Sequence, residues 1–165
     1  MKQGQQKPVV TRRPWEDLTL PEENLKELIQ ATLDKGATLR MKAKGQSMLP
    51  FIHSGDKLTL EPLTQKKLSI GDVVLFCHPG RGNLMAHRII ARKQTSYLIK
   101  PDNSNLANDG WVPVEVIIGR VKGVERAEKK IRIGLGSERL LIAFLSKHGI
   151  LRPLIIYLSR IKGKL

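Results

Sequence analysis

One stretch of the sequence holds a serine in a setting that could support nucleophilic chemistry. Ser47 follows Gly-Gln in "GQSMLPFIHSGDKL", residues 45–58, and a Gly-Asp pair closes the turn after it. A serine hydroxyl attacks a carbonyl when a base takes its proton, and nearby backbone N–H groups can stabilise the resulting oxyanion. A preceding glycine lets a substrate chain approach closely. Ordinary turns contain the same residue types, so this stretch alone favours a plain loop serine.

The base would have to come from one of four histidines. His53 and His78 lie in predicted loops and His148 lies in the basic C-terminal segment, where surface roles are expected. His87 lies inside the strand pattern "LMAHRII", and alternation places it on the same apolar face as its neighbours two residues away. An imidazole there is a satisfied core residue unless the fold brings it to Ser47.

A carboxylate that orients such an imidazole could come from "PDNSNLANDGWVPV", residues 101–114. Asp102 and Asp109 are the two candidates. An Asp-Asn pair after proline is also a common turn. The residues by themselves leave open which aspartate, if either, would face His87.

Most of the elements that must position these groups are predicted strands. "TLPEENLKELIQATLDKG" (19–36) predicts a leading helix, with Leu25, Leu28, Ile29 and Leu33 in one apolar stripe. Short strand patterns follow, separated by Gly, Pro and Asp turns and without a βαβ rhythm, which indicates an all-β domain. They cover residues 38–44, 57–61, 72–77, 85–91, 96–100, 114–124 and 129–133.

The last thirty residues combine helical periodicity with positive charge. Apolar residues repeat at helical spacing after Gly136, and Gly149 and Pro153 predict a break into two pieces. Residues 120–165 hold twelve Lys and Arg against three Glu, which is nine of the fourteen net positive charges. Such a tail either lies on an anionic membrane surface or packs on the sheet as a terminal helix, and the sequence favours neither.

Composition narrows the function classes. The single cysteine, Cys77, excludes an internal disulfide and suits a reducing compartment. We find no Cys/His cluster with metal-ligand spacing, no signal peptide and no apolar run long enough to span a bilayer, so we expect no metal and a cytoplasmic location, free or peripheral on the membrane. Aromatic residues make up only 4% of the chain and no recognition motif is present, so nucleic acid is a poor candidate partner.

Taken in order, the stretches "GQSMLPFIHSGDKL", "IGDVVLF", "AHRII" and "PDNSNLANDGWVPVEVIIGRV" resemble the signal peptidase I superfamily, which includes the self-cleaving SOS-repressor domains. The histidine followed by Arg-Ile is similar to the microsomal type, in which histidine rather than lysine is the base. The resemblance covers about residues 38–124. It implies a coiled antiparallel β-sheet domain without cofactor, which binds a precursor peptide or protein as an added strand and cuts after small residues.

Carried over by residue, the resemblance makes Ser47 the nucleophile, His87 the general base and Asp109 the residue that holds the imidazole. Asp102 would support its loop, and the backbone N–H groups of Gln46 and Ser47 would form the oxyanion hole. A histidine base implies that activity falls below about pH 6.5. The predicted organisation is a mobile segment 1–18, the helix 19–36, a catalytic β domain 37–134 and a helical tail 135–165.

The sequence departs from the family pattern in ways that bear on activity. Pro101 stands where the family's "KGDN" turn has glycine, and we expect no membrane anchor of the usual kind. Residues 1–46 contain neither a helix-turn-helix nor an Ala-Gly or Cys-Gly bond, so repressor-type self-cleavage is not expected. The leading prediction is a serine endopeptidase; the alternative is a non-catalytic module that grips a peptide or partner with the same fold.

Overall fold

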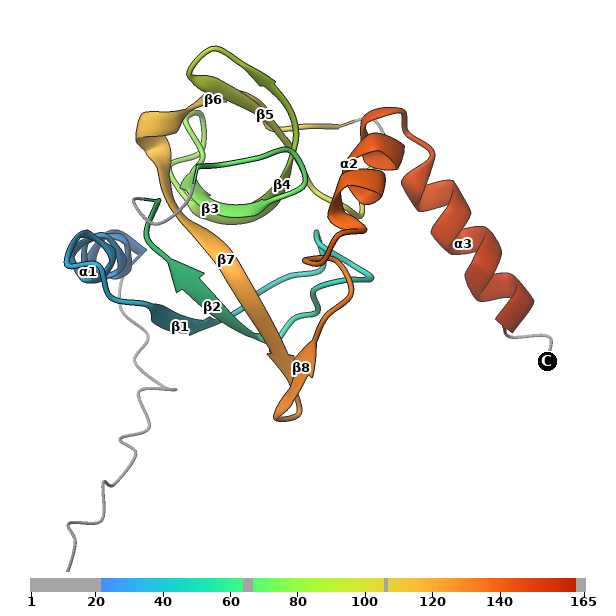
Figure 1. Cartoon of the computed structure of the whole chain (residues 1–165), viewed down its shortest axis with the longest axis horizontal. Helices are drawn as coiled ribbons and strands as arrows, with labels where there is room; N and C mark the ends of the chain where they lie inside the picture. The colour runs from blue at the N-terminus through green and yellow to red at the C-terminus, as the bar shows by residue number, and fades with distance from the viewer. Residues whose placement is uncertain (1–21, 64–66, 106, 163–165) are drawn as a thin grey trace, which may run out of the picture.

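The computed structural model describes residues 22–63, 67–105 and 107–162, so the expected N-terminal segment 1–18 lies outside the described residues. A helix precedes eight strands, and two helices follow them (Figure 1). The helices are α1 (Glu22–Asp34), α2 (Arg139–Lys147) and α3 (Leu151–Lys162), and the strands are β1 (Leu39–Lys42), β2 (Lys57–Glu61), β3 (Val73–Cys77), β4 (Leu84–Lys93), β5 (Ser96–Lys100), β6 (Gly110–Pro113), β7 (Ile117–Arg126) and β8 (Lys129–Ile131).

The strands form one antiparallel sheet in the order β1-β2-β7-β3-β4-β5-β6, with β8 paired to the far end of β7. In Figure 1 the strands β3 to β6 curl around one another, whereas β7 runs on alongside β2 to meet β8. This arrangement confirms the expected class, a mainly β domain with an N-terminal helix and C-terminal helices. The long strand β7 joins the two parts, because it pairs with β2, β3 and β8.

Two apolar clusters fill the curled sheet, and β3 separates them. Val73 and Leu75 belong to the first cluster, together with α1, β2 and β7 residues, and Val74 and Phe76 belong to the second. Side chains of successive strand residues point to opposite faces, so an unbroken apolar run such as "VVLF" serves both clusters. Apolar side chains therefore pack on both faces of β3, and β3 pairs with β4 along the whole length of β3.

The leading helix packs on the first cluster through part of its apolar stripe. Ile29 and Leu33 are buried and Leu25 is half-buried, but Leu28 is half exposed, so its expected place in the buried stripe is wrong. Leu28 precedes Ile29 by one residue and is turned about 100° from it around the helix axis. The helix ends at Asp34, and Gly36, the predicted capping residue, follows it with a positive φ and donates its N–H to the carbonyl of Leu33.

Near the C-terminal end of the sheet, the segment expected as one strand over residues 114–124 begins with a 3-10 turn, Val114–Val116, before β7 starts. A four-residue strand, β6, precedes that turn and was not predicted. It begins at a glycine and ends at a proline, two residues that indicate turns in a sequence. Only its pairing with β5 identifies it as a strand.

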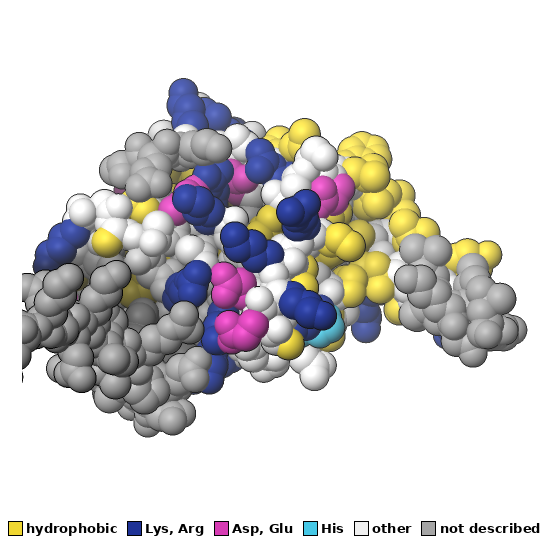
Figure 2. Space-filling view, turned by 60° about the horizontal axis from the view of Figure 1, so that its bottom comes forward, with side chains coloured by type: hydrophobic (Ala, Val, Ile, Leu, Met, Phe, Trp, Pro, Cys, Tyr) yellow, Lys and Arg dark blue, Asp and Glu magenta, His cyan; other side chains and the backbone are white. Residues whose placement is uncertain are grey.

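The C-terminal segment forms two helices that meet at a bend of 106°. Gly149, with its positive φ, lies at the break, as predicted. Pro153 does not break the chain; it is the third residue of α3, in the first turn, where a missing N–H removes no helical hydrogen bond. In the described part of the chain no single helix could span a membrane, and only the bent pair Arg139–Lys147 with Leu151–Tyr157 passes that test of length and composition. Hydrophobic side chains gather at the end of the molecule that α2 and α3 form (Figure 2).

The turn that carries the first Gly-Asp pair is held by a buried aspartate. Both carboxylate oxygens of Asp56 accept hydrogen bonds from Arg126 at 2.8 Å, and one also accepts the backbone N–H of His53. Burial alone would raise the pKa of Asp56, but these hydrogen bonds and the charge of Arg126 together bring that pKa below its ordinary value. The loop between β1 and β2 is thereby tied to β7.

Asp56→Asn is expected to lower the free energy of unfolding by about 2 kcal/mol at neutral pH, because charge-assisted hydrogen bonds are lost. A lowered folded-state pKa means that this contribution is present above the ordinary carboxyl pKa of 3.8 and is lost as the pH falls through the folded-state value. Urea unfolding at several pH values measures it. The difference in free energy of unfolding between wild type and variant should decrease only on strong acidification. A difference that increases there would contradict the assignment.

Candidate active site

Ser47 lies in the loop between β1 and β2, and the first apolar cluster holds this loop in place. Met48 and Ile52 are buried in that cluster on the C-terminal side of the serine. At the base of the loop, the Ala43 N–H donates to the Asp56 carbonyl and the Gly55 N–H donates to the Ala43 carbonyl, both at 2.8 Å. The apolar side chains of the "SMLPFI" stretch are therefore the reason that Ser47 occupies a defined position at the edge of the core.

The three residues singled out from the sequence form one chain of hydrogen bonds. His87 Nε2 lies 2.9 Å from Ser47 Oγ, and His87 Nδ1 lies 2.7 Å from Asp109 Oδ2. The imidazole is 2% exposed and its ring centre is 6.0 Å from that of Phe76. These residues are separated by 40 and 22 positions in the sequence, and only the fold brings them together.

The partners of the imidazole determine which nitrogen carries its proton. An ionised carboxylate only accepts hydrogen bonds, so Nδ1 donates to Asp109. In the neutral ring Nε2 then has a free lone pair and accepts the Ser47 hydroxyl proton. This direction of hydrogen bonding is the one that prepares a serine oxygen for attack on a carbonyl carbon.

Strand pairing sets the position of Asp109. Its backbone N–H donates to the carbonyl of Ile99 at 2.9 Å, immediately before Gly110 begins β6. β5 lies between β6 and the His87 strand β4, and the carboxylate of Asp109 reaches the imidazole across it. The unpredicted strand β6 is thus the element that fixes the carboxylate.

Asp102, the other candidate, has its hydrogen bonds with Arg88 and not with His87, although the charge of His87 acts on its pKa. It is fully buried and both of its oxygens accept hydrogen bonds from Arg88, at 2.8 and 2.7 Å. Arg88 is equally buried and also donates to the carbonyls of Gly71 and Gly134. Burial raises the pKa of Asp102, while the hydrogen bonds and charge of Arg88 oppose the rise. Asp102 therefore holds the β4, β5 and pre-α2 segments together beneath the site, and Pro101 does not prevent this pairing.

Asp102→Asn is expected to cost about 3–5 kcal/mol of folding stability, since it leaves the Arg88 guanidinium buried without a counter-charge. Urea unfolding followed by circular dichroism measures the loss. Glu125→Gln is the matched control, because Glu125 pairs with Arg40, whose side chain is 61% exposed, and such pairs contribute about 1 kcal/mol or less. Similar losses in the two variants would contradict a structural role for the buried pair.

The loop after β5 also holds the backbone on either side of the serine hydroxyl. Asn103 donates its backbone N–H to the Ser47 carbonyl at 2.8 Å and its side-chain amide to the Gln46 carbonyl at 3.2 Å. Both carbonyls thus have partners. Within the described residues no hydrogen bond uses the N–H of Gln46 or Ser47, so these two donors are available to an oxyanion, as the sequence comparison implies.

His78 is a neighbour of the site that sequence reasoning missed. Its Nε2 lies 4.0 Å from Asp109 Oδ1, and its Nδ1 accepts the N–H of Gly80, which leaves the proton of a neutral ring on Nε2. It was expected to have a surface role because it follows β3. The signal that could have found it is alternation: His78 continues the series Val74, Phe76 on one face. His53 and His148 are not part of the site; they contact Pro50 and Phe144.

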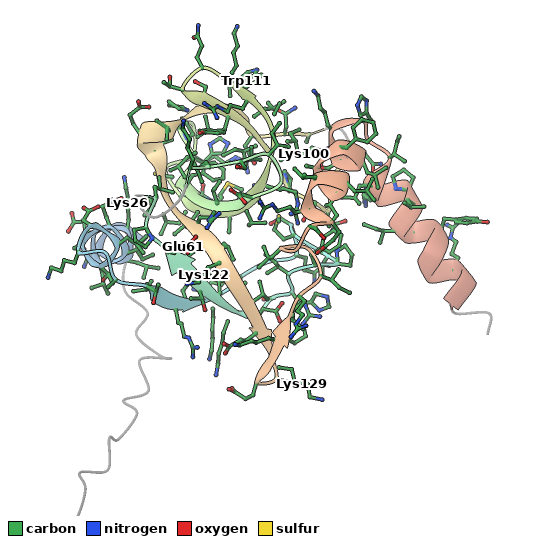
Figure 3. All side chains as sticks on the ribbon, viewed as in Figure 1. Lys26, Glu61, Lys100, Trp111, Lys122 and Lys129 are labelled. Carbon is green, nitrogen blue, oxygen red and sulfur yellow. The ribbon has the colours of Figure 1, made fainter. Side chains whose placement is uncertain are left out.

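Next to α2, Lys100 ends β5 with a buried ammonium group (Figure 3). Its Nζ donates to the carbonyls of Asn105 and Ser146 at 2.7 and 2.6 Å. Burial lowers the pKa of Lys100, and the charge of Asp102 opposes that shift. The lysine does not lie in the Ser47–His87–Asp109 chain; its contacts attach α2 to the loop that contains Asn103.

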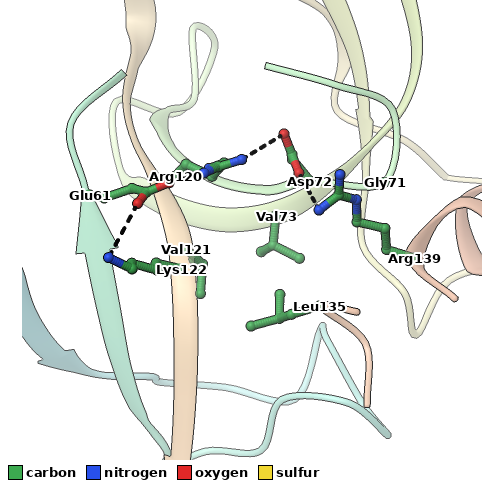
Figure 4. A pocket seen from close by; sticks show the side chains of 9 residues that line it. All are labelled: Glu61, Gly71, Asp72, Val73, Arg120, Val121, Lys122, Leu135 and Arg139. Carbon is green, nitrogen blue, oxygen red and sulfur yellow. Dashed lines mark hydrogen bonds and ion pairs between the residues drawn. The ribbon is translucent and has the colours of Figure 1, made fainter. Parts of the chain in front are cut away.

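A hollow of about 350 Å³ lies on another part of the domain, lined by residues of β2, β3, β7 and α2 (Figure 4). Its charged groups satisfy one another: Arg120 pairs with Glu61 and Asp72, Arg139 pairs with Asp72, and Lys122 lies 3.9 Å from Glu61. None of the three residues of the hydrogen-bonded chain lines it. Because its charges are already paired, this hollow needs no ligand to balance them.

Comparison with known proteins shows the family to which the chain belongs. Among the described residues no group of three His, Cys, Asp or Glu could hold a metal ion. No curated protein matches the sequence. The family model for Peptidase S24-like proteins matches residues 8–122, a range that includes Ser47, His87 and Asp109. This match covers more than half of the chain, which therefore belongs to the Peptidase S24-like family, in the superfamily of signal peptidase I and the self-cleaving repressors.

Proposed function

We propose that this protein is a serine endopeptidase that cuts a precursor peptide or protein, with Ser47 as nucleophile, His87 as general base and Asp109 as the residue that orients it. The observation that supports the proposal best is the continuous pair of hydrogen bonds, 2.9 and 2.7 Å, through the two nitrogens of one buried imidazole. A binding module needs no such chain. Family membership supports a peptidase-type fold, and the residue roles are our inference from the geometry.

The reaction follows from the direction of these bonds. Ser47 Oγ bonds to the substrate carbonyl carbon while His87 Nε2 takes its proton, and the N–H groups of Gln46 and Ser47 stabilise the oxyanion. Asp109 stabilises the imidazolium, which then protonates the leaving amine as the C–N bond breaks. Water attacks the remaining ester, His87 takes a proton from it, and the C–O bond to Ser47 breaks as Oγ regains a proton.

The open edge of β4 is the place where a substrate strand would bind. Arg88 opposite Lys100 is the last pair between β4 and β5, yet β4 continues beside β3 through residues 84–87. The backbone N–H and C=O of Ile89 form hydrogen bonds on the side of β4 that faces β3. Because these directions alternate along a strand, Ala86 and Leu84 direct their N–H and C=O groups to the opposite side, where β5 no longer pairs. No strand in the described part of the chain pairs there. A peptide added at this edge would pass beside His87, next to Ser47.

The test is incubation of the wild-type chain with a proteome-derived peptide mixture at neutral pH, followed by mass spectrometry of new termini. The expected result is a set of cuts after small residues that is absent from the mixture without protein and with denatured protein. The yield should fall on acidification, because a protonated imidazole has no lone pair to accept the Ser47 proton. Peptides that are retained but uncut would instead support the alternative, a non-catalytic binding module.

A further inference from the structure

The second helix has two apolar faces, and only one of them is used by the domain. Ile142, Ala143 and Ser146 are buried against the body of the protein. On the opposite face Leu140, Leu141 and Phe144 are 56%, 59% and 57% exposed. Exposed large side chains that occur singly are ordinary, but three on one face of a nine-residue helix make a contiguous apolar surface.

The third helix extends this surface. Ile150, Leu154 and Tyr157 follow the spacing i, i+4, i+7 and are 48%, 37% and 63% exposed. Figure 2 shows hydrophobic side chains gathered over this end of the molecule, away from the mixed charges of the sheet. We call these six residues of α2, α3 and their junction the apolar face.

The segment that carries the apolar face has charges of one sign in its sequence. Residues 139–165 contain six Lys and Arg and not one Asp or Glu. Lys147, Arg152 and Arg160 are exposed beside the apolar residues. Apolar side chains surrounded by cations match a bilayer that carries anionic headgroups over a hydrocarbon interior.

We propose that the apolar face docks on the surface of an anionic bilayer, with Lys147, Arg152 and Arg160 at the headgroups. The helices bend by 106° at Gly149, so the pair can lie along the interface with both of its exposed apolar stripes inserted. One face of α2 remains buried in the domain, and that contact keeps the catalytic body attached at the surface.

Docking would also place the catalytic loop at the membrane, a consequence that depends on the proposed function. The Lys100 ammonium donates to the carbonyl of Ser146 on α2, and Asn103, three residues further, donates to the carbonyl of Ser47. A single short loop therefore connects the membrane-facing helix to the nucleophile.

The test is co-sedimentation of the full chain with two kinds of vesicle: phosphatidylcholine alone, and phosphatidylcholine with about one-third phosphatidylglycerol. Wild type is expected to bind the anionic vesicles at least about tenfold more tightly than the neutral ones, and less tightly at high salt. Leu141→Ser/Phe144→Ser should weaken that binding at least about tenfold, because two large apolar side chains are lost. Lys147→Gln/Arg152→Gln should also weaken it, by removing headgroup contacts.

Two matched variants control for loss of any exposed apolar or basic residue. Ile133→Ser changes a side chain that is 68% exposed outside the apolar face, and Lys129→Gln/Arg132→Gln removes two exposed cations near β8. Both should bind like wild type. The proposal is overturned if wild type stays in the supernatant, if the controls lose as much binding, or if light scattering shows a dimer that Leu141→Ser/Phe144→Ser dissolves. Ser47→Ala should still bind, so failure of the peptidase assignment would leave this result unaffected.

Discussion

Ser47→Ala is expected to remove the cuts that the wild-type chain makes, with a fall in rate of at least about 10⁴-fold. The substitution deletes the oxygen that lies 2.9 Å from His87 Nε2 and leaves the imidazole with no hydroxyl to activate. The methyl group that remains fits where the serine side chain was, and the loop is held by the buried side chains of Met48 and Ile52. The variant should therefore fold as wild type does.

The measurement is the yield of new peptide termini over time, with the unfolding midpoint recorded for each protein. Ser54→Ala is the matched control, since Ser54 is an exposed serine in the same loop and lies outside the hydrogen-bonded chain. It should cut at the wild-type rate. If Ser47→Ala cuts as fast as wild type, the nucleophile has been wrongly assigned and the peptidase proposal fails with it.

Asp109→Asn is expected to lower kcat by about 10⁴-fold with a much smaller change in KM. The amide that replaces the carboxylate can donate to His87 Nδ1, which would move the ring proton to Nε2 and leave no lone pair facing Ser47. It also removes the negative charge that stabilises the imidazolium in the transition state. Both effects act on the chemical step, so substrate binding at the β4 edge should be retained.

Steady-state kinetics on a peptide identified from the mixture would check this split between kcat and KM. Glu115→Gln removes an exposed carboxylate from the turn that follows β6 and should leave kcat unchanged. Asp102→Asn separates the two aspartates, because the structure assigns Asp102 to Arg88. If Asp102→Asn lost kcat without losing stability while Asp109→Asn kept its activity, the roles inferred for the two residues would be reversed.

The pH response offers an independent view of the same residues. In the proposed mechanism the rate depends on the neutral form of a histidine base, whereas stability on the acid side depends on carboxylates such as Asp56, whose folded-state pKa is lowered. Activity should therefore be lost on mild acidification, at a pH where the protein is still folded. A loss of both together would indicate that acid inactivates the protein by unfolding it.

The sequence determined which elements form, because their signals are local. Alternation and turn residues predict β2 and β5 at their observed bounds, and glycine at 36 and 149 marks helix ends through a backbone conformation that it adopts without strain. It also indicated the candidate catalytic residues, because Ser47, His87 and Asp109 stand in an order that resembles a known superfamily. The strand β6 was not predicted, because its four residues begin with a glycine and end with a proline and carry no periodic signal.

Only the tertiary structure decided which groups meet. The sequence left Asp102 and Asp109 both open as partners of the histidine, and the strand pairs β4–β5 and β5–β6 bring Asp109 to it, while Asp102 goes to Arg88. Tertiary packing likewise divides α2 into a buried and an exposed apolar face. The sequence does not distinguish these faces, because the large residues on both are apolar. Distances between residues 40 positions apart depend on strand pairing and core packing, and these are properties of the whole chain that no local stretch encodes.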